Sequence, residues 1–92
     1  MSGLSLFTPS DVQQQLADVI RKKRKQLKLS RSALAEKSTV PASTIKKFET
    51  TSQISLRQFI LLWQCVESLD SLMRLTKEAD YQPRSIDEVL SG

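Results

Sequence analysis

Histidine is absent from this 92-residue chain, which also has only two glycines and one cysteine. Without His and with a single Cys, the chain lacks the ligands of the usual structural zinc sites. The two glycines stand at positions 3 and 92, which excludes the glycine-rich loops that bind phosphates. One cysteine excludes an internal disulfide and is typical of a reducing cytosol. We therefore predict a cytoplasmic protein that is not an enzyme and has no cofactor and no metal site.

Long apolar runs are also missing. No segment approaches the roughly 20 apolar residues that span a bilayer. The first ten residues, MSGLSLFTPS, lack the basic and long apolar regions of a secretory signal. A chain of this length forms one small domain with a modest core. These features predict a single domain that does not interact with a membrane.

Charge is distributed unevenly along the chain. Residues 1–49 contain ten Lys or Arg and four Asp or Glu, whereas residues 50–92 contain four and six. A concentrated positive field favours a polyanionic partner, and nucleic acid is the commonest one inside cells. The run 21–25, RKKRK, adds to this field either as a solvated helix end or through phosphate contacts.

Apolar residues recur at helical spacing through most of the chain. We expect helices at about 9–27, 31–37, 42–50, 56–67 and 69–80, with Thr8, Ser30 and Ser55 as N-caps. In the first helix, Val12, Leu16, Val19 or Ile20, and Leu27 mark a buried face. We predict an all-α fold with an N-terminal arm (1–8), a helical domain (9–80) and a C-terminal tail (81–92). The apolar residues of the two tails are candidates to dock on a second subunit or a partner protein: Leu4, Leu6, Phe7, Ile86, Val89 and Leu90.

Residues 29–49 carry the most informative pattern, two short helices joined by a tight turn. The residues that would close a shared core are Leu34, Ala35, Val40, Ile45 and Phe48. The outer face of the second helix is left to small and cationic side chains: Ala42, Ser43, Lys46 and Lys47. Such a helix suits the DNA major groove, which is about as wide as an α-helix.

This segment resembles the helix-turn-helix of the Cro/CI class, also called the XRE family. The matching residues are Leu34-Ala35-Glu36-Lys37, Val40, Ser43-Thr44-Ile45 and Glu49, and the similarity extends over residues 9–79. It implies a five-helix, lambda-repressor-like DNA-binding domain. It also implies a structural ion pair between Arg24 and Glu49, since both positions match that family's paired residues.

Within this class the chain is most similar to the HipB-type antitoxins. The similarity lies in the FTPSDV entry to the first helix, the FET ending of the third, and Leu56 and Phe59. It implies a homodimer that represses its own toxin–antitoxin operon and binds a HipA-like kinase toxin. Two alternatives stay open: a stand-alone XRE-type regulator, and an interaction module that neutralises a partner without reading DNA.

Four positions depart from the family pattern. Thr39 and Lys28 stand where glycine is common, and Arg31 stands where glutamine is common. Pro41 replaces the usual serine and cannot cap a helix with its side chain, so we expect it as the first residue of the third helix. A left-handed backbone at Thr39 would be costly, because Thr is β-branched.

Roles in DNA binding follow from these positions. We expect Ala42, Ser43, Lys46 and Lys47 to face base edges in the major groove. The expected contacts to the DNA backbone are Arg31, Thr50, Ser52 and Arg57. Arg31 would be assisted by the amides at the start of its helix.

Dimerisation is expected because one such module reads few base pairs, and a palindromic operator on double-stranded DNA presents two half-sites. The surplus apolar residues of the last two helices are candidates for the interface: Leu61, Trp63, Leu69, Leu72 and Met73. The alternative is that these residues only fill the core of a monomer.

Overall fold

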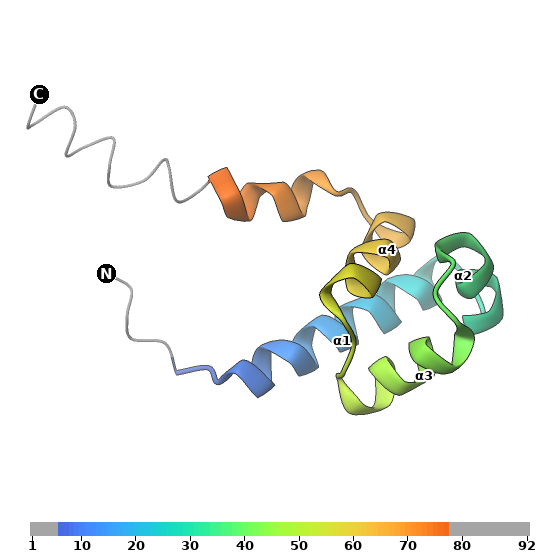
Figure 1. Cartoon of the computed structure of the whole chain (residues 1–92), viewed down its shortest axis with the longest axis horizontal. Helices are drawn as coiled ribbons and strands as arrows, with labels where there is room; N and C mark the ends of the chain where they lie inside the picture. Colours follow the sequence, from blue (N-terminus) through green and yellow to red (C-terminus); the bar gives the residue numbers. More distant parts are fainter. Residues whose placement is uncertain (1–5, 78–92) are drawn as a thin grey trace, which may run out of the picture.

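The computed structural model describes residues 6–77, in which helices are joined by short connections and no strand occurs (Figure 1). The helices are α1 (Pro9–Gln26), α2 (Arg31–Ser38), α3 (Ala42–Thr51) and α4 (Leu56–Val66). A fifth helical stretch covers residues 70–77. The expected helix bounds agree with these to within one residue wherever they are described. Residues 1–5 and 78–92 lie outside the described part. The expected docking residues Leu4, Ile86, Val89 and Leu90 are among them.

Side-chain caps explain where three of the helices begin. The Thr8 hydroxyl accepts from the Asp11 amide at 3.0 Å, and the Asp11 carboxylate accepts from the Thr8 amide at 3.0 Å, forming a capping box. Ser30 caps α2 and Ser55 caps α4 by accepting from the amide three residues on. These bonds satisfy amides that have no partner inside a helix.

Three helices end at residues with left-handed backbone. Lys28 follows α1 with φ 58°, Thr39 follows α2 with φ 66°, and Ser52 follows α3 with φ 65°. Glycine is favoured at such positions, because a Cβ atom crowds the backbone there. The amides of Thr39 and Ser52 each donate to the carbonyl four residues back, at 2.8 Å. The chain therefore ends these helices sharply without glycine.

The core lies where α1 and α4 meet the α2–α3 pair. Its buried members are Ala17, Ile20, Leu34, Val40, Ile45, Phe48, Phe59 and Leu62. The rings of Phe48 and Phe59 meet edge to face with centroids 6.0 Å apart, joining α3 to α4. Helix α1 packs against α3, and α4 packs against α2 and α1, so the apolar side of α3 is covered by the other helices.

The expected buried face of α1 is only partly right. Ile20 is buried, but Val12 and Leu27 are 49% and 51% exposed, and Ala17 and Arg24 are buried instead. Val12 lies in the first turns of α1, and the N-terminal end of this helix extends beyond α3 and α4 (Figure 1). Leu27 lies beyond the last turn, where the chain leaves the helix. Sequence periodicity identifies the apolar face of a helix. It does not show which turns of the helix are covered by neighbouring helices.

Candidate nucleic-acid interface

Helix α3 presents two chemically different faces. Ile45 and Phe48 are buried, and residues on the opposite side of the helix are exposed. The exposed side chains are Ser43, Lys46, Lys47 and Thr50, and Ala42 is half-buried at its edge. The structure thus places the four expected base-reading residues on one helix, and three of them are exposed. A helix with an apolar back and a cationic front fits a major groove.

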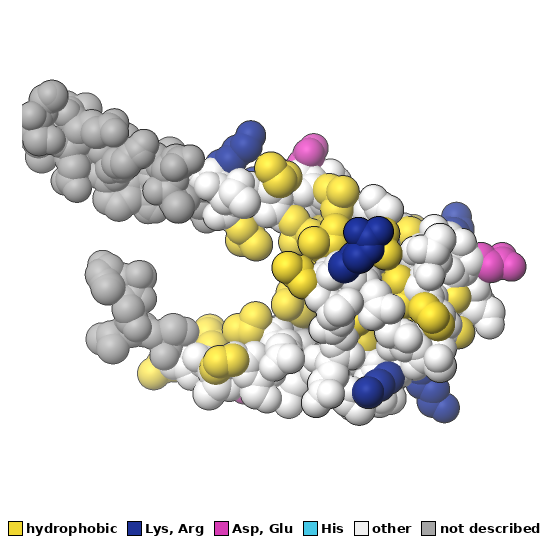
Figure 2. All heavy atoms as spheres, in the orientation of Figure 1, with side chains coloured by type: hydrophobic (Ala, Val, Ile, Leu, Met, Phe, Trp, Pro, Cys, Tyr) yellow, Lys and Arg dark blue, Asp and Glu magenta, His cyan; other side chains and the backbone are white. Residues whose placement is uncertain are grey.

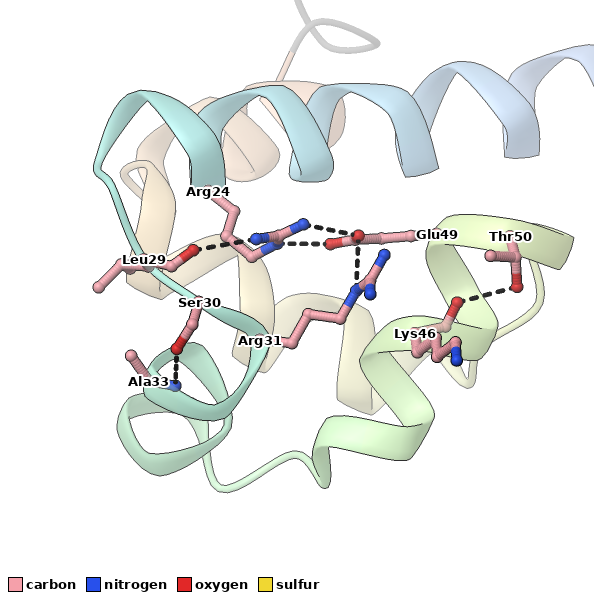
Figure 3. A network of polar contacts seen from close by, with 8 residues as sticks. All are labelled: Arg24, Leu29, Ser30, Arg31, Ala33, Lys46, Glu49 and Thr50. Carbon is pink, nitrogen blue, oxygen red and sulfur yellow. Dashed lines mark hydrogen bonds and ion pairs between the residues drawn. The ribbon is translucent and has the colours of Figure 1, made fainter.

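Behind this face, a buried carboxylate fixes the end of α3. Glu49 accepts two hydrogen bonds from Arg24 of α1, from Nε at 2.8 Å and from Nη2 at 2.9 Å (Figure 3). The third nitrogen of Arg24, Nη1, donates to the Leu29 carbonyl at 2.9 Å. The two side chains of the pair are 1% and 8% exposed. This bidentate pair ties α3 to the C-terminal end of α1.

A second arginine reaches the same carboxylate. Nε of Arg31, the first residue of α2, donates to Oε1 of Glu49 at 3.0 Å (Figure 3). Burial raises the pKa of Glu49, but hydrogen bonds and charges from Arg24 and Arg31 outweigh this effect and hold the pKa below its ordinary value. One negative charge thus connects helices α1, α2 and α3.

The other expected backbone contacts are placed differently. Arg57 is exposed at the start of α4, and the Thr50 hydroxyl donates to the Lys46 carbonyl at 2.9 Å. Ser52 is the left-handed residue that ends α3, and its carbonyl lies 3.5 Å from the side-chain amide of Gln13. Thr50 and Ser52 thus have structural contacts that the sequence did not suggest.

The turn between α2 and α3 uses the unusual residues without a glycine. Thr39 adopts the left-handed conformation, and its hydroxyl donates to the Ser38 carbonyl. Ser38 is buried, and its hydroxyl accepts from the Val40 amide at 3.1 Å. We expected Pro41 to be the first residue of α3. It is instead the N-cap residue, since its ψ of 143° is extended. It supplies the carbonyl that accepts from Ile45 at 3.1 Å.

The candidate interface residues divide into two groups. Leu61, Trp63 and Leu72 are half-buried against the core of their own chain. The Trp63 indole donates to the Ser68 carbonyl at 3.0 Å and to the Ser71 hydroxyl at 2.8 Å, which ties the 70–77 helix to α4. By contrast, Leu69 and Met73 are 38% and 52% exposed.

Sequence reasoning missed two ion pairs. The first is Arg31–Glu49, although an arginine in place of the usual glutamine signals a changed contact. The second joins Lys23 of α1 to Glu67 after α4 at 2.7 Å, and the two residues are 44 positions apart. The nearby Lys23 lowers the pKa of Glu67. Within residues 6–77 there is no cluster of metal ligands, and no helix is long and apolar enough to cross a membrane.

Comparison with known families agrees with this geometry. Residues 20–62 match the model of a family described as Helix-turn-helix. The matched segment contains α2 and α3 with the last turns of α1 and the first of α4. The match supports the Cro/CI (XRE) class of DNA-binding transcriptional regulators, and the fold is all-α and lambda-repressor-like. Searches of curated proteins and of solved structures found no match.

Proposed function

We propose that the chain is a sequence-specific repressor that inserts α3 into the major groove of double-stranded DNA. The observation that carries the proposal is the outer face of α3, where Ser43, Lys46 and Lys47 are all exposed above a buried apolar side. Lysines at these positions can donate to guanine O6 and N7. The proposed contacts to the DNA backbone are Arg31 at the start of α2, Thr50 and Ser52 at the end of α3, and Arg57 at the start of α4. We assign the chain no catalytic role.

The test is a fluorescence anisotropy titration with a duplex selected by the protein from a random library, against a shuffled duplex of equal composition. We expect the double variant Lys46→Ala/Lys47→Ala to lose at least about tenfold in affinity for the selected duplex. The matched control, Lys22→Ala/Lys25→Ala, removes the same charge from the exposed outer side of α1. This control should lose less affinity than Lys46→Ala/Lys47→Ala, and its loss should be the same for both duplexes. No preference for any selected duplex would refute the proposal, as would equal effects of the two double variants.

Dimerisation belongs to the same proposal. An almost entirely apolar groove of about 630 Å³ lies between α1, the start of α4 and the 70–77 helix, and Leu69, Leu72 and Met73 line it. Figure 2 shows hydrophobic side chains gathered where the N-terminal half of α1 faces that helix. Exposed apolar surface of this kind favours a protein partner. A second copy is favoured because a palindromic operator requires two reading helices.

Sedimentation equilibrium tests the dimer. Met73→Asp should weaken association, because it places a charge in the groove. Leu27→Asp is the matched control, since Leu27 is 51% exposed, as Met73 is 52% exposed, but does not line the groove. A monomer at high micromolar concentration of the unaltered chain would refute this part of the proposal and leave DNA reading to be judged separately.

The finer proposal is that this repressor is the antitoxin of a HipA-like operon. Its support is the resemblance of the FTPSDV and FET segments to HipB-type antitoxins, together with the exposed apolar groove. A DNA target and a single cysteine both favour a cytoplasmic location. Co-expression with a kinase encoded beside its gene should restore growth and give a stable complex. If the neighbouring kinase is toxic and co-expression does not restore growth, the result supports a stand-alone regulator. If the chain also prefers no DNA sequence, the result supports an interaction module.

A further inference from the structure

Arg31 differs from Arg24 in how much of its guanidinium is used. Arg24 is 8% exposed, and all three of its nitrogens donate to Glu49 or Leu29. Arg31 is 36% exposed and donates only through Nε, so its terminal nitrogens Nη1 and Nη2 have no hydrogen-bond partner within residues 6–77. These two nitrogens are the part of the network that is available to a ligand.

The carboxylate of Glu49 also restricts the direction of Arg31. A guanidinium is planar, so a bond from Nε to a buried acceptor limits the plane in which Nη1 and Nη2 lie. In Figure 3 the two arginines reach Glu49 from different sides, with Arg31 coming from the start of α2. The amides of Arg31 and Ser32 begin the same helix and have no partner inside it, whereas the Ala33 amide donates to the Ser30 hydroxyl. Fixed guanidinium nitrogens and helix-end amides together suit a phosphate oxygen.

We propose that Glu49 is a positioning residue for DNA binding, because it aims the terminal nitrogens of Arg31 at a phosphate while Nε stays bonded to the carboxylate. The inference rests on the proposed function and adds a role that a simple structural ion pair would not have. Since Glu49 lies in the last turns of α3, the phosphate contact at Arg31 sets the position of the reading helix in the groove. The network therefore contributes to discrimination between DNA sequences as well as to affinity.

Charge and positioning predict opposite results for Glu49→Gln. The substitution removes a negative charge, so electrostatics alone would tighten binding to every duplex. If Glu49 positions Arg31, affinity for the selected duplex falls by about tenfold or more, as for one lost hydrogen bond to a charged group. Affinity for the shuffled duplex should not fall. Glu36→Gln is the matched control, since Glu36 is exposed on α2 and its loss changes charge alone; it should tighten both duplexes equally.

Arg31→Lys provides a second test that does not alter the buried carboxylate. Lysine keeps the charge, but its single ammonium cannot bond Glu49 and present a planar fork to a phosphate. We expect about a tenfold loss for the selected duplex with an unchanged slope of log K against log salt. Arg31→Gln should lose the affinity and also reduce that slope by about 0.9.

The outcomes separate the inference from the function on which it rests. If the unaltered chain prefers no duplex, the proposed function fails before any variant is measured. If it prefers the selected duplex and Arg31→Lys binds both duplexes like the unaltered chain, the positioning role alone is refuted. Equal losses on both duplexes for Glu49→Gln, with a lowered urea midpoint, would mean that Glu49 only holds the fold. If that variant does not fold, Arg31→Lys decides.

Discussion

Replacing Thr39 with glycine should make the domain more stable, although the change removes a side chain. Thr39 has φ 66° and is exposed, so its side chain contributes little burial. A left-handed residue other than glycine costs about 1–2 kcal/mol. Glycine loses about 0.5–1 kcal/mol more backbone freedom on folding, which offsets part of the gain. The expected net effect is about 0.5–1 kcal/mol of added stability.

Urea unfolding followed by circular dichroism measures this difference. The midpoint of Thr39→Gly should rise with an unchanged slope, and the melting temperature should rise by about 2–8 °C. Lys37→Gly is the matched control, because Lys37 is exposed in the last turn of α2, two residues before Thr39, and does not have positive φ. That substitution should destabilise the domain by about 0.5–1 kcal/mol. A lowered midpoint for Thr39→Gly would show that the threonine stabilises the turn and would refute the argument from backbone strain.

Three further predictions concern the core, the buried carboxylate and the last helix. Ile45 is fully buried, so Ile45→Val should cost about 0.5–1.5 kcal/mol in the free energy of unfolding, measured by urea denaturation. The folded pKa of Glu49 is lowered, so the stability it contributes is present above its ordinary pKa of 4.5. That contribution should be lost as pH falls below 4.5 and through the folded pKa. If the urea midpoint of Glu49→Gln falls with pH as steeply as that of the unaltered chain, Glu49 is not the source of the pH dependence. Trp63→Phe removes the indole donor to Ser68 and Ser71, so amides of residues 70–77 should exchange hydrogen about fivefold faster. Equally faster exchange in α3 would show that the effect is not local.

The helices and the helix-turn-helix could be predicted from local sequence signals. Thr8, Ser30 and Ser55 mark the starts of three helices, and the spacing of Leu34, Val40 and Ile45 identifies the paired helices. Caps and apolar periodicity act over a few residues, so they can be read from the chain alone. The side chains on the outer face of α3 follow from the same periodicity.

Contacts between distant segments were harder to predict. The Arg31–Glu49 bond and the Lys23–Glu67 pair depend on how helices cross, which a single sequence does not specify. The exposed Val12 was wrongly placed in the core for the same reason, because coverage depends on the lengths of the neighbouring helices. Arg24–Glu49 was anticipated through a family resemblance and not from spacing.

The way in which the 70–77 helix is attached has a consequence for how such a protein can evolve. It is tied to α4 by Trp63 and carries the exposed residues Leu69 and Met73, and it lies away from α3 with α4 between them (Figure 1). Within residues 6–77, the side-chain bonds that fix the end of α3 come from Arg24 and Arg31, and the last helix reaches the core through Leu72. Under the proposed function, substitutions on the last helix would therefore change the protein partner and leave the recognised operator unchanged.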